Sequence, residues 1–161
     1  MGIQCRVSNP IIPFLSTVQN SRDHRKICVI DGKVAFTGGV NLADEYANEI
    51  TRFGHWKDTA IMLKGDAVQS FTMLFLEMWA VNQMEPADCQ NYLTPKHVVP
   101  DPPHGYVIPY GDHPYDNENV GEEVYFHILN HSKKYVHIMT PYLILDSEMI
   151  TALTRAAKSG I

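Results

Sequence analysis

Apolar and polar positions in the first part of the chain follow patterns typical of short strands. Residues 27–30 form a continuous apolar run with branched side chains, which predicts a strand buried on both faces, and we expect Cys28 to be a core residue. The pair Asp31-Gly32 indicates a hairpin, because a type I′ turn requires positive φ at both central positions. Residues 34–37 are therefore predicted as the partner strand and residues 56–63 as a third strand.

The clearest helical pattern begins at Gly65 and Asp66. Apolar side chains recur there at three- and four-residue steps, which predicts a helix with one stripe in the core. The stripe contains Val68, Phe71, Leu74, Phe75, Met78 and Val81. Weaker patterns predict a strand at residues 2–8 and a short helix at residues 42–48.

Residues 85–115 are rich in proline, which blocks helix interiors and central strands, so we predict a linker there. A second unit, residues 116–161, should follow it. Its pattern predicts a helix at residues 120–131, a strand at residues 135–140 and a helix at residues 146–159. The alternation of strands and helices predicts an α/β fold.

The ends of that last helix carry specific signals. Asp146 or Ser147 is a suitable N-cap, because a short polar side chain can accept a hydrogen bond from the free N–H groups of the first turn. Gly160 follows the last apolar position and should stop the helix.

Composition narrows the class of protein. The chain has 161 residues, of which 45% are hydrophobic and 19% charged, and a formal net charge of −5. This charge argues against a nucleic-acid partner, because phosphate backbones are bound by clustered Lys and Arg. Cys5, Cys28 and Cys89 are odd in number and have no C-x-x-C spacing, which favours free thiols in a reducing compartment. The longest apolar run, residues 71–81, is too short to span a bilayer and contains Glu77, so no transmembrane segment is predicted in this chain.

The candidate chemistry lies around the predicted hairpin. On an extended strand, residues two apart face the same way, so His24 and Lys26 can converge on one site. Gly38 and Gly39 allow close approach to the backbone, and Asn41 offers amide donors beside them. One imidazole, one fixed positive charge and neutral donors suit an anionic, phosphate-like centre.

This spacing resembles the H-x-K-x4-D motif of the phospholipase D superfamily, with Asp31 as its aspartate. Within that superfamily, further words resemble bacterial cardiolipin synthases. They are NP at residues 9–10, DHRK at 23–26, GGVNLADEY at 38–46, WKDT at 56–59 and TPYLILD at 140–146. The resemblance implies a phospholipase D-like mixed sheet flanked by helices and incomplete at both ends.

The resemblance also implies a two-step phosphatidyl transfer. His24 would attack the phosphorus of phosphatidylglycerol, expel glycerol and hold a phosphohistidine, which a second phosphatidylglycerol would convert to cardiolipin. Lys26, Gly39 and Asn41 would bind the phosphate oxygens, while Asp31 would support the site. Asp58 would orient the histidine ring. No cofactor and no metal are implied.

The family's active site uses two copies of the motif, and the second copy is absent here. His131-Ser-Lys133 mimics its start, but Ile138 occupies the position of the aspartate. The resemblance therefore implies an internal fragment of a longer enzyme at the cytoplasmic face of the plasma membrane. Residues 1–84 would end the first half, 85–115 would link, and 116–161 would begin the second half without its motif. The isolated chain would be inactive or weakly active without the missing half or a homodimer mate.

Three other interpretations remain open. The first is a single-motif phosphodiesterase, phospholipase D or nuclease acting as a dimer, and the second is a non-catalytic lipid-binding module. The third is a metal site. It is less favoured than a solvent-exposed helix surface, because zinc sites require a specific set and geometry of ligands. Its candidate ligands are Glu123, His127 and His131 at helical spacing, or Asp112, His113 and Asp116. We expect His131 to be an exposed residue at a helix end.

Overall fold

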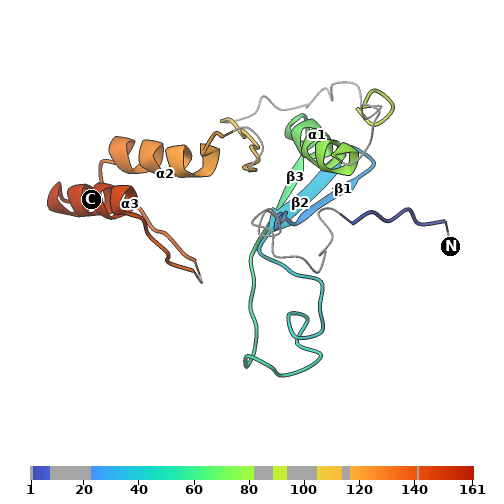
Figure 1. The fold of residues 1–161 in the computed structure, drawn as a ribbon, viewed down its shortest axis with the longest axis horizontal. Coiled ribbons are helices and arrows are strands. Elements are labelled where there is room, and N and C mark those ends of the chain that lie inside the picture. The colour runs from blue at the N-terminus through green and yellow to red at the C-terminus, as the bar shows by residue number, and fades with distance from the viewer. Residues whose placement is uncertain (1, 8–22, 82–88, 94–104, 114–116, 141) are drawn as a thin grey trace, which may run out of the picture. The chain divides into compact units, whose positions relative to one another are not determined.

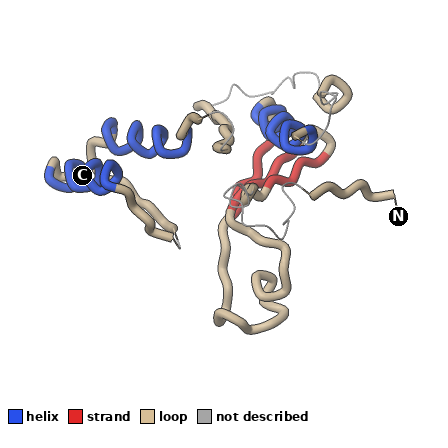
Figure 2. Tube along the Cα trace, in the orientation of Figure 1, coloured by secondary structure: helices blue, strands red, loops and turns tan. Residues whose placement is uncertain are grey.

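The computed structural model describes residues 2–7, 23–81, 89–93, 105–113, 117–140 and 142–161 (Figure 1). The chain divides into two compact units, Met1–Tyr110 and Gly111–Ile161, and the boundary falls inside the segment predicted as a linker. The described residues form a small α/β protein with three strands and three helices (Figure 2). None of the helices that the structure describes is long and apolar enough to cross a membrane.

The first unit contains one sheet and one helix. Strands β1 (Ile27–Ile30), β2 (Val34–Gly38) and β3 (Ala60–Lys64) pair in that order, and helix α1 (Ala67–Ala80) follows. Both pairings are antiparallel, so the mixed sheet implied by the family resemblance is wrong for the described strands. The short hairpin between β1 and β2 allows only antiparallel pairing, because parallel strands need a crossover of about a dozen residues or more.

The predicted turn between β1 and β2 is confirmed. Asp31 and Gly32 both have positive φ, at 53° and 62°, and the N–H of Lys33 donates to the carbonyl of Ile30 over 3.0 Å. Ile30 pairs with Val34, so Lys33 is a third connecting residue. This local turn fixes the register of the whole hairpin.

The core of the first unit lies between α1 and one face of the sheet. Ala35 and Val68 are fully buried there, Phe71 is nearly so, and Val29 and Leu63 pack against them. Strand β1 is thus buried on one face only, and the prediction of two buried faces is wrong. Cys28 is exposed rather than in the core, because alternate residues of a strand point to opposite faces.

Helix α1 confirms the prediction of a helix but only part of its core stripe. Phe75 and Val81 are exposed by 47% and 42%, and Leu76 is buried in their place. Only the residues of α1 that face the sheet pack against it, so apolar residues elsewhere on the helix remain exposed.

Three weaker predictions are wrong for the residues that the structure describes. Residues 2–7 and 135–140 are extended but pair with no described strand. Residues 42–48 form turns instead of a helix, with one helical bond from the N–H of Ala47 to the carbonyl of Ala43. Asn48 then adopts a positive φ of 61°, which ends the helical path.

The second unit contains helices α2 (Val120–His131) and α3 (Ser147–Lys158), as predicted. The carboxylate of Asp146 accepts a hydrogen bond from the N–H of Met149 over 2.7 Å, which confirms it as the N-cap. At the other end, Gly160 has a φ of 86°, and Ile161 N–H donates to Ala156 O over 3.1 Å. This is the Schellman arrangement that a C-terminal glycine permits.

Candidate functional site

A groove of about 650 Å³ lies at one end of the sheet in the first unit. It forms where the chain enters β1 and leaves β2, because the antiparallel register sets Ile27 opposite Thr37 and Gly38 opposite Ala60. The hairpin thus brings together residues on both sides of it. The groove lining includes His24, Lys26, Cys28, Phe36, Asn41 and Leu42.

Three predicted site residues therefore share one groove. His24 is exposed, and Lys26 and Asn41 are half-buried. The ammonium of Lys26 donates to the backbone carbonyl of His24 over 2.6 Å, which holds the lysine beside the imidazole-bearing residue. An imidazole, an ammonium and a carboxamide can together contact a phosphate group.

The charge of Lys26 is set by opposing influences. Burial lowers its pKa from the ordinary value, and the carboxylates of Asp23 and Asp58 act in the opposite direction through their charge. The net shift is downward. Asp58 therefore influences the groove electrostatically although it is not part of the lining.

Asp23 and Arg25 form an ion pair that the sequence analysis did not identify. Arg25 Nε and Nη2 donate to the two carboxylate oxygens over 2.8 and 3.1 Å, and the backbone N–H of Arg25 adds a third bond. Burial raises the pKa of Asp23, but these bonds and the Arg25 charge outweigh it and lower the pKa overall. The ion pair fixes the backbone on both sides of His24. In the sequence, the acidic and basic residues two positions apart in DHRK indicate such a pair.

At Gly38 and Gly39, neighbouring protein atoms occupy the space that a side chain would fill. A Cβ at Gly38 would collide with the backbone of Thr59 and Ala60, and one at Gly39 would collide with the Asp58 carboxylate. The N–H of Gly39 donates to the carbonyl of Thr59 over 3.0 Å, so this amide already has a partner within the protein. The close approach predicted for the glycines is that of the segment entering β3.

Asp58 is fixed by bonds of its own. Its carboxylate accepts from the indole N–H of Trp56 over 3.2 Å and from the N–H of Thr59 over 2.8 Å. Asp31 lies at the far end of β1, roughly 15 Å along the extended chain from Lys26. Asp31, Gly39 and Asp58 are thus outside the groove that contains the other three predicted residues.

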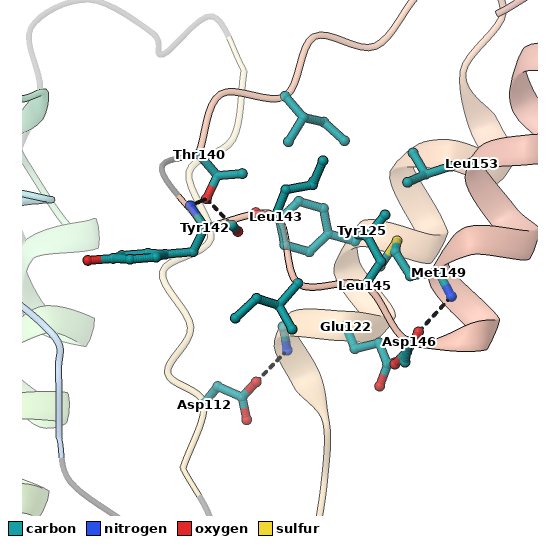
Figure 3. Close-up of a pocket in the computed structure, with 13 residues that line it drawn as sticks. Asp112, Glu122, Tyr125, Thr140, Tyr142, Leu143, Leu145, Asp146, Met149 and Leu153 are labelled. Atoms are coloured by element: carbon teal, nitrogen blue, oxygen red, sulfur yellow. Dashed lines mark hydrogen bonds between the residues drawn. The ribbon is translucent and has the colours of Figure 1, made fainter.

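A second groove, of about 460 Å³, lies in the second unit (Figure 3). Most of its lining is apolar, but Glu122 of α2 and Asp146 at the start of α3 lie side by side at one end (Figure 3). Interaction with the Asp146 carboxyl group raises the pKa of Glu122 above its ordinary value. An acidic end repels phosphate, so the groove in the first unit is the better candidate for an anionic ligand.

No group of three potential metal ligands is present among the described residues. The rings of His127 and His131 stack with centroids 4.1 Å apart, and His131 Nδ1 lies 2.9 Å from the carbonyl of His127. His131 is exposed at the end of α2, as predicted. Asp116, a ligand in the alternative metal hypothesis, lies outside the described residues.

Known proteins resemble this chain over nearly its whole length. A Streptococcus mutans protein named only as uncharacterized is 57% identical over 162 residues, covering 100% of this chain and 34% of its own length. The cardiolipin synthase of Geobacillus kaustophilus is 36% identical over 161 residues, covering 99% of this chain and 32% of its own. The cardiolipin synthase 2 of Bacillus cereus is 38% identical over 149 residues, covering 92% and 29%.

The chain is thus similar, over nearly its whole length, to one segment of proteins named cardiolipin synthase. The chain spans about a third of the length of these relatives. No family model matches the chain, and no solved structure matches it.

Proposed function

We propose that this chain contributes the nucleophilic half of a cardiolipin synthase active site. A nitrogen of the His24 imidazole bonds to the phosphorus of phosphatidylglycerol, the bond from phosphorus to the glycerol oxygen breaks, and that oxygen takes up a proton. The hydroxyl of a second phosphatidylglycerol then bonds to phosphorus, loses its proton and releases the imidazole. One phosphodiester replaces another, so the reaction consumes no nucleotide and needs no cofactor.

The observation that carries this proposal is the shared groove of His24, Lys26 and Asn41. Lys26 and Asn41 would stabilise the non-bridging oxygens as negative charge grows in the transition state. Loss of one such donor typically costs about 2.7–4 kcal/mol of transition-state stabilisation. The similarity to proteins named cardiolipin synthase supports the choice of lipid.

We assign supporting roles to the other motif residues. Asp58 fills the space that Gly39 leaves open and favours the charged form of Lys26. In this arrangement Asp58 stabilises the connection between β2 and β3. This role differs from the direct orientation of the histidine ring that the family resemblance implies. Asp31 suits the hairpin turn because aspartate tolerates the positive φ that the turn requires.

The transfer also requires a second acid–base group to protonate the departing glycerol and to activate the incoming hydroxyl. We propose that it comes from outside this chain, from a second phospholipase D-like half or from a homodimer mate. Residues 1–84 would then complete the first half and residues 116–161 would begin the second. The assembled enzyme would act on phosphatidylglycerol at the cytoplasmic face of the plasma membrane, with no nucleic-acid partner.

An activated substrate tests the first step without the second acid–base group. Phosphatidyl-p-nitrophenol has a leaving group that departs without protonation. We expect the purified chain to release about one equivalent of p-nitrophenol and to carry an acid-labile phosphatidyl group on His24, detected by mass spectrometry. His24→Gln should abolish both signals, and the matched control His131→Gln should retain them.

Two results would redirect the assignment. Lipid binding without any covalent adduct on His24 would favour the non-catalytic lipid-binding module. Release of p-nitrophenol from a nucleotide diester at a higher rate than from the lipid diester would favour a single-motif phosphodiesterase or nuclease.

A further inference from the structure

The sheet of the first unit has one face that no described element covers. Helix α1 covers the face with Ala35 and Leu63. On the opposite face, the register aligns Cys28, Phe36 and Met62 side by side. Cys28 is exposed, and the side chains of Phe36 and Met62 are exposed by 37% and 54%. Apolar groups thus lie in a row on an open surface.

This open apolar row continues into the candidate groove. Cys28 and Phe36 belong to the groove lining, and the loop after β2 adds Val40 and Leu42, exposed by 39% and 101%. Asn41, a proposed phosphate ligand, lies between them in the sequence. The polar end of the groove is therefore contiguous with an apolar wall, defined here as Cys28, Phe36, Val40 and Leu42.

The charges of the groove select the kind of ligand that would fit both parts. The carboxylate of Asp23 is engaged by Arg25, and Lys26 supplies an ammonium at the same end. That end suits a phosphate, while the wall suits a hydrocarbon group. In a nucleic-acid diester, polar sugars flank the phosphate and the flat bases lie beyond them, so it matches an aliphatic wall beside the phosphate less well than a hydrocarbon chain does. A phosphatidyl lipid has both parts.

We propose that the apolar wall binds the glycerol backbone and first acyl carbons of the phosphatidyl group, with Leu42 as its principal contact. This inference rests on the proposed function, since it takes Lys26 and Asn41 as the phosphate site. Leu42 is a suitable principal contact because its side chain is fully exposed in the free protein, so covering it with lipid removes the most apolar surface from water.

Two soluble probes separate the wall from the phosphate site. Dihexanoyl-phosphatidylglycerol, used below its micelle concentration, has short acyl chains, and glycerophosphoglycerol is the same head group without them. We expect calorimetry to show that Leu42→Ser weakens binding of the acylated probe about tenfold and leaves the deacylated probe unchanged. Met139→Ser, a change at a side chain 93% exposed in the second unit, is the matched control and should alter neither affinity.

Chemical shifts give a second readout that remains sensitive when binding is weak. The Leu42 methyl and Phe36 ring signals should move with the acylated probe and not with the deacylated one. The proposal of an apolar wall is refuted if Leu42→Ser has no effect on affinity or weakens binding of both probes equally. Lys26→Gln separates the two ideas: it should weaken both probes, and if it weakens neither, the phosphate site of the proposed function fails instead.

Discussion

At the scale of single residues, the second unit brings together two carboxyl groups that repel each other when both are ionised. Asp146 caps α3 by accepting from Met149 N–H, and Glu122 lies beside it in the first turn of α2 (Figure 3). The hydrogen bond to Asp146 is the main cause of the raised pKa of Glu122, followed by burial and the Asp146 charge. Asn119 opposes the shift by donating to the Glu122 carboxylate. The neighbouring Asp146 therefore favours the protonated form of Glu122.

Stability should depend on pH through this pair. The folded-state pKa of Glu122 exceeds its unfolded value near 4.5, so its contribution is fully present below pH 4.5 and is lost as pH rises through the folded pKa. Glu122→Gln keeps a donor toward Asp146 at every pH. We expect this variant to unfold at a higher temperature than the wild-type chain at pH 7, with the difference disappearing below pH 4.5. Circular dichroism melts from pH 3.5 to 8 measure it.

Glu123→Gln is the control for this prediction, because Glu123 is an exposed acid in the same helical turn and its loss changes net charge equally. It should not reproduce the pH-dependent gain. Equal melting curves for the Glu122 and Glu123 variants at every pH would show that the raised pKa of Glu122 contributes nothing to stability.

At the scale of elements, the sequence predicted those features that depend on neighbours in the chain. The hairpin turn follows from Asp31-Gly32, and α1 from the spacing of its apolar residues, so both signals are local. Residues 135–140 have the composition of a strand, but a strand also needs a partner, and none is present among the described residues. The prediction that Cys28 lies in the core is wrong, because an apolar run does not show which face of the strand a helix will cover.

In the candidate site, too, local sequence predicts some features and not those that depend on distant contacts. The H-x-K spacing places His24 and Lys26 together without knowledge of the fold, because both precede one strand. The pairing of Asp58 with Gly39 joins residues 19 positions apart in sequence and depends on the register of β2 and β3. A single sequence contains no direct signal for such a contact.

The junction of β2 and β3 gives a test of this contact. Gly39→Ala should lower the free energy of unfolding by about 1–3 kcal/mol, because the added methyl group collides with the Asp58 carboxylate. In an Asp58→Ala background the same change should cost less than about 1 kcal/mol, since the obstacle is gone. Urea unfolding of the four variants completes the double-mutant cycle. Gly2→Ala, at a position with open space around it, should be neutral, and equal costs in both backgrounds would refute the contact.

At the scale of the whole molecule, large apolar side chains are exposed in both units among the described residues. In the second unit, Met139 and Ile144 are each at least 90% exposed. Contiguous exposed apolar surface in soluble proteins commonly marks an interaction site. Relatives that are about three times as long as this chain have further polypeptide that could provide such contacts.

The proposed function also predicts how this chain behaves with phosphatidylglycerol. Among the described residues, the lining of its candidate groove contains one histidine, His24. The proposed transfer from phosphatidylglycerol needs a second acid–base group, which typically contributes 10²–10⁴-fold to the rate. We therefore expect the purified chain at nanomolar concentration to form cardiolipin no faster than its His24→Gln variant, measured by mass spectrometry of the lipids. If two copies combine their imidazoles, the rate should instead rise with the square of chain concentration and fall on mixing with excess His24→Gln chain. The proposal that one chain contributes only half of the active site would be contradicted by robust turnover that is proportional to chain concentration and unaffected by that mixing. One chain would then supply every group that the transfer requires.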